Sequence, residues 1–470
     1  MTRGAHGWLL LGLVLAAGCA DGPRPGATAG PDGPDGPDGA AAPARRKNVV
    51  FIVIDTLRAD AMSLARTPNL RKLKAQGQSP ALAWSGATWT VPSVISMFTG
   101  STVRQHGWDF PFPRFMDMGK ETYAPAPSLP TLAEVLKGAG YHTVSFHNNS
   151  MLNQGLGLDR GFDAWNPTGD RNLARKLEEE VDDWDDPADP AGQPNFVYVH
   201  LLGPHHPLRP SAKACRRWGI RPKQVAKTKG LRIEDAQQGD EADQDLYRRG
   251  YYASVEDTDR VLGAVLAALG EHRENSLVVL TSDHGELLGE HGLVGHEQWV
   301  FEPLTRVPLI VTGSTVTLPS IMSNTMIPDL VTQSLGLVHD WPVKLSDPLP
   351  LVAQRQGKVA LSPDGKIKGI WDDEAFGAGF SSFDISQSTA EDAPLARLPF
   401  PHADAKLRMA RGAWALRVPG RRLAPVSKAM TNELQEALEA LGYMGSEDPL
   451  PAEPGEPTDP TEAPDAAEDG

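Results

Sequence analysis

The feature that most constrains the fold is an uninterrupted apolar run, Asn48-Val-Val-Phe-Ile-Val-Ile-Asp55. A strand that is apolar on both faces must be covered on both faces, as in a parallel sheet flanked by helices. The run ends on Asp55. Because ligands of open α/β sheets bind beyond the carboxyl ends of the strands, this carboxylate is expected at a functional site.

Strand-like and helix-like segments alternate along the next 260 residues. This alternation predicts an α/β fold with a mainly parallel central sheet flanked by helices. Helices are expected at 130–140 and 245–269, and strands at 141–146, 195–202, 276–280 and 306–311. Short strand-like pieces with Gly-rich turns over 357–385 predict a small antiparallel unit. We therefore assign residues 47–340 to a main domain and residues 341–445 to a C-terminal subdomain, with a short helix expected at 432–442.

The two ends of the chain differ in composition from its body. Residues 1–19 contain Arg3, an apolar run and small residues before Cys19, as in a bacterial signal peptide. The sequence Leu15-Ala-Ala-Gly-Cys19 resembles a lipoprotein box, which predicts lipidation of Cys19, export, and a periplasmic or cell-surface lipoprotein held on a membrane. Ala16 stands where Leu is usual, so an ordinary cleaved signal or an uncleaved anchor stays open. Residues 20–46 read as a disordered Pro/Gly linker and residues 446–470 as a disordered acidic tail.

The charge of the chain gives no reason to expect a nucleic-acid partner. The formal net charge is -15, but nine acidic and no basic residues lie in 446–470, so the body is only mildly acidic. No nucleic-acid partner is expected. Residues 211–240 start basic, become mixed and polar, and are expected to form a surface excursion. Cys215, the second of two cysteines, is interpreted as a semi-buried thiol.

Three side chains at strand ends point to a metal site. The strand at 276–280 runs into Ser282-Asp283-His284-Gly285, so Asp283 and His284 are expected at the same sheet edge as Asp55. Two carboxylates and one imidazole suit a single divalent cation, Mg, Mn, Ca or Zn. A lone strand-end Asp is more often a helix cap, but two with an adjacent His favour a site.

A hydroxyl lies at the start of a helix within Gly86 to Gly100. Pro92 and Ser93 are expected as the first helical positions, so unpaired amides and the positive end of the helix dipole would face Thr90. Taken alone, the stretch is better explained as a capped helix start than as a nucleophile, because such caps are common.

Together these motifs resemble the sulfatase family of the alkaline phosphatase superfamily. The matching pieces recur in family order at 48–60, 67–70, 90–100, 106–107, 204–207, Asp259, 282–296 and 306–309. The resemblance implies an alkaline-phosphatase-like sheet and an enzyme that hydrolyses sulfate, phosphate or phosphonate esters of a small molecule, glycan or lipid. It implies that Asp55, Asp283 and His284 hold one divalent metal, that Thr90 is the nucleophile, and that His205 and His296 contact the transferred group or protonate the leaving oxygen.

Other residues of these motifs are interpreted as supports. His106 and His291 are expected to hold loops by hydrogen bonds, and Glu286 to lie behind the site or at a helix start. His205 is preferred over the adjacent His206 because the spacing Pro-His-any-Pro selects it.

Four departures from the family pattern bear on the substrate. Sulfatases carry Cys or Ser at the Thr90 position, matured to formylglycine, whereas oxidation of Thr gives a ketone. Val94 replaces an Arg, Thr56 replaces a second metal Asp, and Phe146-His-Asn-Asn149 replaces Gly-Lys-Trp-His, which removes the usual Lys. These changes favour phosphorus esters over sulfate. Two alternatives are a phosphotransferase acting on surface glycans or lipids and a non-catalytic binding module on the same fold.

Overall fold

The computed structural model describes nine stretches of the chain. They are residues 46–109, 122–152, 156–231, 239–296, 299–347, 351–355, 357–372, 381–386 and 423–426. The predicted signal peptide with Cys19, most of the linker, the helix expected at 432–442 and the acidic tail lie outside them. Among the described residues, no helix combines the length and apolar character needed to cross a membrane.

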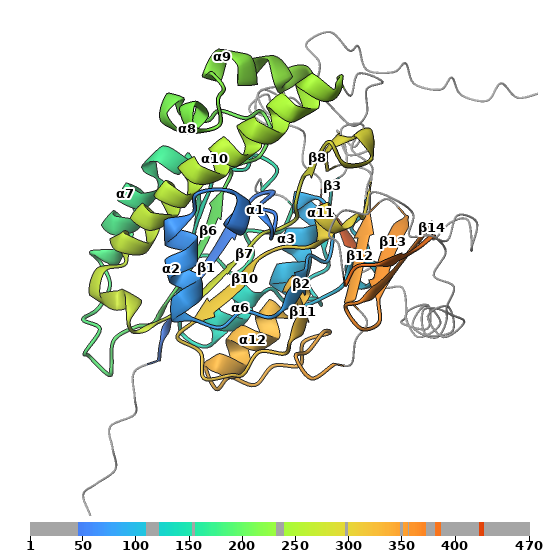
Figure 1. The fold of residues 1–470 in the computed structure, drawn as a ribbon. Helices are drawn as coiled ribbons and strands as arrows, with labels where there is room; N and C mark the ends of the chain where they lie inside the picture. Colours follow the sequence, from blue (N-terminus) through green and yellow to red (C-terminus); the bar gives the residue numbers. More distant parts are fainter. Residues whose placement is uncertain are drawn as a thin grey trace, which may run out of the picture. The chain divides into compact units, whose positions relative to one another are not determined.

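A six-stranded sheet forms the centre of the fold, in the order β10-β7-β1-β6-β4-β5 (Figure 1). Every neighbouring pair is parallel except β10 and β7. The strands are β1 (Asn48–Ile54), β4 (His142–His147), β5 (Ala164–Pro167), β6 (Asn195–Leu201), β7 (Ser276–Thr281) and β10 (Leu309–Thr312). The prediction of a mainly parallel α/β sheet is confirmed.

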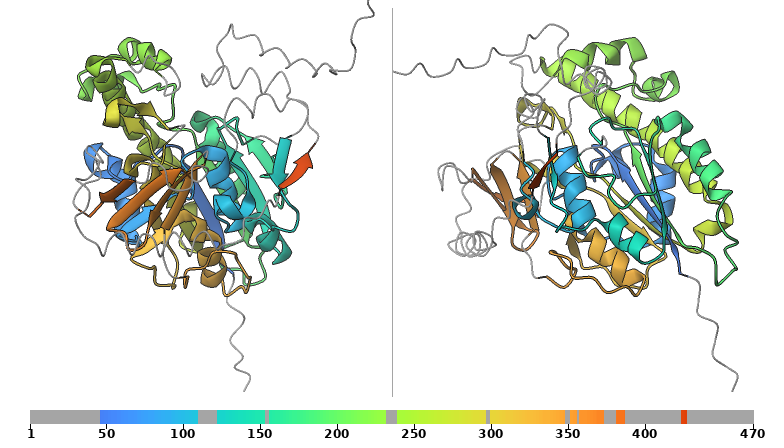
Figure 2. Two further views of the ribbon diagram at one scale, coloured as in Figure 1. Left: turned by 90° about the vertical axis from the view of Figure 1, so that its right-hand side faces the viewer. Right: turned by 180° about the vertical axis from the view of Figure 1, so that it is seen from behind.

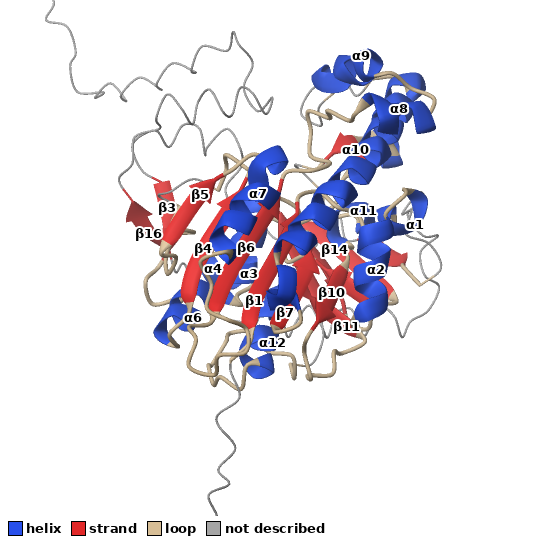
Figure 3. Cartoon of the chain, turned by 90° about the vertical axis from the view of Figure 1, so that its left-hand side faces the viewer, coloured by secondary structure: helices blue, strands red, loops and turns tan. Residues whose placement is uncertain are grey.

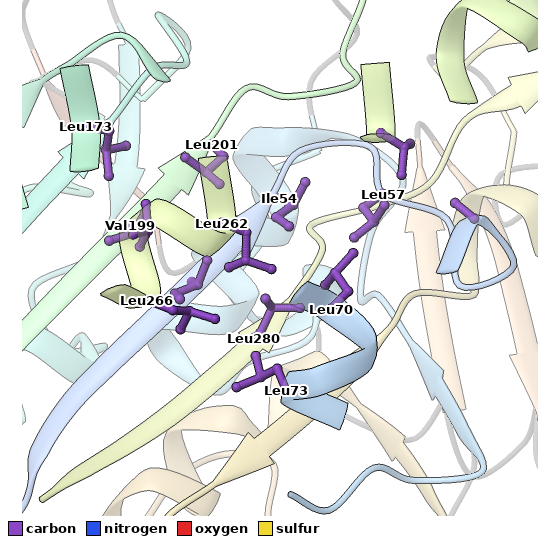
Figure 4. Close-up of a cluster of buried hydrophobic side chains, with 14 of the residues drawn as sticks. Ile54, Leu57, Leu70, Leu73, Leu173, Val199, Leu201, Leu262, Leu266 and Leu280 are labelled. Carbon is purple, nitrogen blue, oxygen red and sulfur yellow. The ribbon is translucent and has the colours of Figure 1, made fainter. Parts of the chain in front are cut away.

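Both faces of the central strand β1 are buried, as its sequence requires. Val49, Phe51 and Val53 belong to one apolar cluster, which includes residues of α3 (Thr90–Thr99), α6 (Leu132–Gly138) and α12 (Ile327–Ser334). The alternate residues belong to a second cluster, with residues of α2 (Pro68–Gln76), α7 (Asp170–Val181) and α10 (Glu241–Ala268). Figure 2 shows the two helical layers, and Figure 4 shows Ile54 and Leu280 of the second cluster beside Leu70, Leu73 and Leu262.

A separate antiparallel sheet of four strands follows the main domain. Its strands are β12 (Leu351–Arg355), β13 (Lys358–Ser362), β14 (Ile367–Asp372) and β15 (Ser381–Asp384). It joins the main domain where the Gln354 amide donates to the Gly86 carbonyl oxygen at 3.1 Å. The C-terminal antiparallel unit expected from the sequence is therefore present, and it contacts the segment that leads to Thr90.

Short elements complete the described structure. The paired strands are β2 (Leu82–Trp84) with β11 (Ile321–Ser323), β3 (Thr122–Pro125) with β16 (Leu423–Val426), and β8 (Leu287–Leu288) with β9 (Val294–Gly295). The short helices are α1 (Ala61–Leu64), α4 (Val103–His106), α8 (Ala212–Arg217), α9 (Pro222–Val225), α11 (Glu302–Thr305), and the 3-10 turns η1 (Ala226–Gly230), η2 (Gly270–Arg273), η3 (Glu290–Gly292) and η4 (Asn324–Met326).

Several predicted boundaries shift for local reasons. The helix α10 begins at Glu241, four residues before the predicted start, because the Asp240 side chain caps it by accepting from the Asp243 amide at 2.9 Å. The strand expected from Arg306 begins only at Leu309 and is the antiparallel edge strand.

Candidate active site

Three ligand-type side chains meet at the carboxyl ends of two neighbouring strands. Asp55 follows β1, and Asp283 and His284 follow β7, which pairs with β1 in parallel. One ligand atom from each lies within 4.8 Å of the others, and all three residues are fully buried. The structure therefore brings the predicted trio together.

Hydrogen bonds hold the two strand ends in register. The Ser282 hydroxyl accepts from the Leu57 amide at 2.8 Å and lies 2.6 Å from the Ile54 carbonyl oxygen. The Thr56 amide donates to Asp283 Oδ1 at 3.2 Å. Thr56 has a positive φ of 56°, and its carbonyl oxygen accepts from the Tyr251 hydroxyl at 2.7 Å, which supports this unusual backbone. Gly285 must lack a side chain because a Cβ there would lie 1.9 Å from the Pro303 carbonyl oxygen.

The ligand-type atoms of the trio lie close to one another. Asp55 Oδ1 and Asp283 Oδ2 are buried and accept no hydrogen bond from the described residues. His284 Nδ1 lies 2.9 Å from the Gly285 carbonyl oxygen, which can only accept, so Nδ1 carries the proton. The other ring nitrogen, Nε2, lies 3.5 Å from Asp283 Oδ2 and 3.9 Å from Asp55 Oδ1. Two buried carboxylate oxygens without a hydrogen-bond donor among the described residues, beside an imidazole nitrogen, are a donor set that fits a divalent metal.

The pKa values of the two carboxylates are shifted in opposite directions. Burial alone would raise the pKa of Asp55, but His205, then His200 and His284, outweigh burial and lower it to about 2. Burial, followed by the charge of Asp55, raises the pKa of Asp283. A cation among the three ligands would favour ionisation of both.

Thr90 is the first residue of α3, two positions before the predicted helix start, and it is fully buried. Its Oγ1 lies 3.5 Å from His284 Nε2. The first turn of α3 is fixed to the loop that carries Asp283, because the Ser93 hydroxyl donates to the Asp283 carbonyl oxygen at 2.6 Å. The neighbouring hydroxyl of Thr88 instead donates to the Trp299 carbonyl oxygen at 2.7 Å. Thr90 is thus the hydroxyl that faces the trio.

His205 and His296 also lie at this site. The His296 ring is 4.3 Å from the His284 ring and 5.2 Å from the His205 ring between centroids. His205 Nδ1 donates to the His206 carbonyl oxygen, and His296 Nδ1 lies 3.2 Å from Glu286, which agrees with a supporting role for that carboxylate. Burial is the largest cause that lowers the pKa of each histidine. Their Nδ1 atoms are engaged, so Nε2 is the nitrogen of each ring able to meet a reacting group.

Two residues that contact the site, Asn149 and His200, were given no role in the sequence analysis. The Asn149 amide donates to Asp55 Oδ2 at 2.6 Å and to Thr90 Oγ1 at 3.4 Å. Its Oδ1 accepts from the Met151 amide at 2.8 Å, which fixes the orientation of the side chain. His200 Nε2 lies 3.2 Å from Asp55 Oδ2 and its Nδ1 2.7 Å from the Tyr198 hydroxyl. The available signal for His200 was a histidine within an otherwise apolar strand.

A third addition comes from the C-terminal sheet. The guanidinium of Arg355 is fully buried, 4.6 Å from the centre of the Trp89 ring and 3.8 Å from Asp109. Trp89 precedes Thr90 directly. The charge of Arg355 is among the lesser causes that lower the pKa of His296, after burial and the other site histidines. The C-terminal unit thus places a cation beside the residue that precedes α3.

His106 forms the expected hydrogen bonds, whereas His291 contacts an aromatic ring. His106 Nε2 lies 3.1 Å from the Ser96 hydroxyl, and its Nδ1 accepts from the Trp108 amide at 3.1 Å. The His291 ring stacks on Phe301 with centroids 4.1 Å apart.

Comparisons with known proteins agree with this architecture. The sequence model described as Sulfatase matches residues 47–339. The uncharacterized sulfatase YidJ of Escherichia coli is 25% identical over 323 residues, which cover 57% of this chain and 63% of that relative, so the chain spans less than two thirds of its length. Among solved structures, the phosphonate monoester hydrolase of Agrobacterium radiobacter superposes with a TM-score of 0.58 at 16% identity, covering 82% of this chain and 100% of that chain. A 2-O GAG sulfatase superposes with a TM-score of 0.56 at 17% identity, covering 79% of this chain and 91% of that chain.

Proposed function

Because the chain belongs to the sulfatase family, whose model matches residues 47–339, we propose that it is a metal-dependent hydrolase of anionic esters with Thr90 as nucleophile. One observation carries the proposal. The Thr90 hydroxyl lies 3.5 Å from a His284 nitrogen that lies close to carboxylate oxygens of Asp55 and Asp283.

The similar proteins support an anionic ester as the substrate class. The solved structures that share the fold include a phosphonate monoester hydrolase and a GAG sulfatase. Their names span both phosphorus and sulfur esters. We propose phosphate or phosphonate esters ahead of sulfate, because Thr90 cannot become an aldehyde and Val94 stands where sulfatases carry Arg.

Asp55, Asp283 and His284 would hold the cation. When bound, a divalent cation supplies Lewis-acid stabilisation of negative charge and lowers the pKa of a nearby hydroxyl. Asn149 positions Asp55 and Thr90 through its two N–H groups. His200 supports Asp55 from the other side, which restricts the carboxylate to one orientation.

The chain's own groups then account for bonds and protons. Thr90 Oγ1, having lost its proton to solvent, forms a bond to phosphorus or sulfur while the bond to the ester oxygen breaks. The departing oxygen takes a proton from Nε2 of His205 or His296, whichever ring is protonated at that nitrogen. A water then attacks the adduct, gives its proton to the same histidine, and releases Thr90 Oγ1, which regains a proton.

The experiment compares metal-replete wild type with Thr90→Ala on an aryl phosphate, a phosphodiester, an aryl phosphonate and an aryl sulfate. Wild type should turn over at least one phosphorus ester, and Thr90→Ala should lose at least about a thousandfold in kcat. Thr88→Ala is the matched control, because that hydroxyl is committed to the Trp299 carbonyl oxygen. Turnover that survives Thr90→Ala would remove Thr90 from the mechanism.

Two further outcomes identify the alternatives. Transfer to an added alcohol or glycan in preference to water would indicate a phosphotransferase. Absence of turnover together with absence of copurified metal would indicate a binding module.

For its location we propose an exported lipoprotein that is attached to a membrane through Cys19. The support is the Leu15-Ala-Ala-Gly-Cys19 sequence that follows an apolar run. Mass spectrometry of the mature N-terminus should find a diacylglyceryl group on Cys19, and globomycin should block processing. A mature protein that begins at another residue without lipid would contradict this assignment.

A further inference from the structure

A strongly basic surface segment projects from an otherwise acidic protein. Residues 211–230, comprising α8, α9 and η1, carry seven basic and no acidic side chains, in a chain with a formal net charge of -15. We call these twenty residues the basic module. The sequence identified them as a surface excursion, and the proposed chemistry makes no use of them.

Most of the module's basic side chains are exposed and form no ion pair within the described part of the chain. Six of its basic side chains form no ion pair with any described residue, and all six are exposed: Lys213, Arg216, Arg221, Lys223, Lys227 and Lys229. The seventh, Arg217, pairs with Glu256 of α10. Like charges held together repel one another, so a partner that brings negative charge would stabilise the arrangement.

The module is anchored, so its charges are held in a fixed array. Trp218 stacks on Tyr252 of α10 with ring centroids 5.1 Å apart. The Ser211 hydroxyl lies 3.0 Å from Asp257 Oδ1, and Cys215 is fully buried. Two acidic side chains of α10, Glu256 and Asp257, are therefore engaged in these anchoring contacts.

The module adjoins the candidate active site along the chain and in space. Its first residue follows His205 by six positions, through a loop in which the His206 ring lies 6.1 Å from the Tyr247 ring of α10. The same end of α10 contacts the loop before His296, because the Gln244 side chain donates to the Gly292 carbonyl oxygen at 3.1 Å. Figures 1 and 3 show α8 and α9 projecting at the end of the sheet where α1 lies, and α1 begins six positions after Asp55 in the chain.

The composition of the module favours a polyanion over a lipid surface. Surface-binding segments of membrane proteins combine basic residues with exposed large apolar side chains. Among the described residues the exposed large hydrophobic side chains are Leu64 and Val338, both outside the module. Its aromatic residue, Trp218, is engaged with Tyr252.

We propose that the basic module binds the flanking anionic groups of a linear, multiply charged glycan whose sulfate or phosphate ester reaches Thr90. This inference rests on the proposed function, since it names the substrate class of the same site. Each exposed cation contributes little alone, but six in a fixed array raise the local concentration of a polyanion and its association rate. Binding should therefore weaken steeply with salt.

The test measures binding separately from turnover. The protein is the full chain, metal-replete and carrying Thr90→Ala, and the probes are dextran sulfate, neutral dextran and vesicles containing anionic phosphatidylglycerol. The test variant adds Lys223→Gln, Lys227→Gln and Lys229→Gln. The control variant adds Lys72→Gln, Arg171→Gln and Lys366→Gln, three exposed basic residues elsewhere on the surface.

At low ionic strength, dextran sulfate should bind at least about tenfold more weakly to the module variant than to the parent. The control variant should match the parent, and neutral dextran should not bind. In the active background, the module variant should keep the parent's kcat/KM on a small aryl ester.

Equal affinity of the two variants for dextran sulfate, or no binding by the parent, would overturn the proposal. Module-dependent binding to the vesicles in preference to dextran sulfate would replace it with a membrane surface. Because binding is measured without turnover, polyanion binding can be tested even if the protein hydrolyses no ester. Likewise, ester hydrolysis can be tested even if the module binds no polyanion.

Discussion

Replacing His106 should remove a defined part of the protein's acid sensitivity. His106 is fully buried beneath α3, and burial, opposed weakly by a hydrogen bond to the Pro92 carbonyl, lowers its pKa from 6.5 to about 3. Its Nδ1 accepts from the Trp108 amide, so a second ring proton has no acceptor there. The folded protein therefore keeps this ring neutral where the unfolded chain protonates it.

The sign and the size follow from this difference. Above about pH 6.5 neither state binds the proton and His106 contributes no pH dependence; as the pH falls toward 3 the unfolded state binds more protons and stability is lost. Between about pH 8 and about pH 5 this single group should cost about 2 kcal/mol of the free energy of unfolding.

Urea unfolding followed by tryptophan fluorescence at the two pH values measures the effect. His106→Gln should lower stability at the higher pH but lose about 2 kcal/mol less than wild type on acidification. If His106→Gln loses as much stability as wild type between the two pH values, the buried neutral ring is not the source.

Three further outcomes follow from the site and its supports. Chelation should lower the Tm of wild type, because a metal present at a thousandfold its Kd stabilises the folded state by about 4 kcal/mol. Adding a divalent cation should restore the Tm. The Tm of Asp283→Ala should change neither on chelation nor on addition of the cation. Asn149→Ala should reduce kcat by about 10 to 100-fold with a smaller change in KM, because its amide orients Thr90 and Asp55. A change confined to KM would contradict this role. Asp259→Ala should lower the free energy of unfolding in urea by about 2 to 3 kcal/mol without altering metal content. The reason is that the carboxylate accepts from the backbone amides of Asn69 and Leu70 at 3.1 and 2.8 Å. Unchanged stability would show that other groups cap α2.

The main strands of the sheet and the meeting of Asp55, Asp283 and His284 could be predicted from the sequence. The apolar run before Asp55 requires a strand buried on both faces, and Asp283 follows a second such strand. Parallel pairing then brings both aspartates to one edge, so their proximity follows from topology alone. The family resemblance added Thr90, His205 and His296, which come from elements whose packing no local pattern specifies.

The missed residues depend on long-range contacts. Asn149 contacts Asp55 across 94 positions of the chain, and Arg355 contacts Trp89 from the C-terminal sheet. The amide of Asn149 and the guanidinium of Arg355 show no spacing that would predict these contacts. The helix start was misplaced by two residues because Pro92 favours the first turn, whereas the structure begins the helix at Thr90 and has Pro92 third.

The most direct test of the account is the identity of the covalent intermediate. Metal-replete protein is mixed with an ester that it hydrolyses, quenched in acid within one turnover, digested, and analysed by peptide mass spectrometry. The digest should contain one phosphoryl or sulfuryl group on Thr90 in wild type and none in Thr90→Ala, and Thr88→Ala should retain the adduct. Turnover with no adduct on Thr90, or an adduct on another side chain, would contradict the central claim.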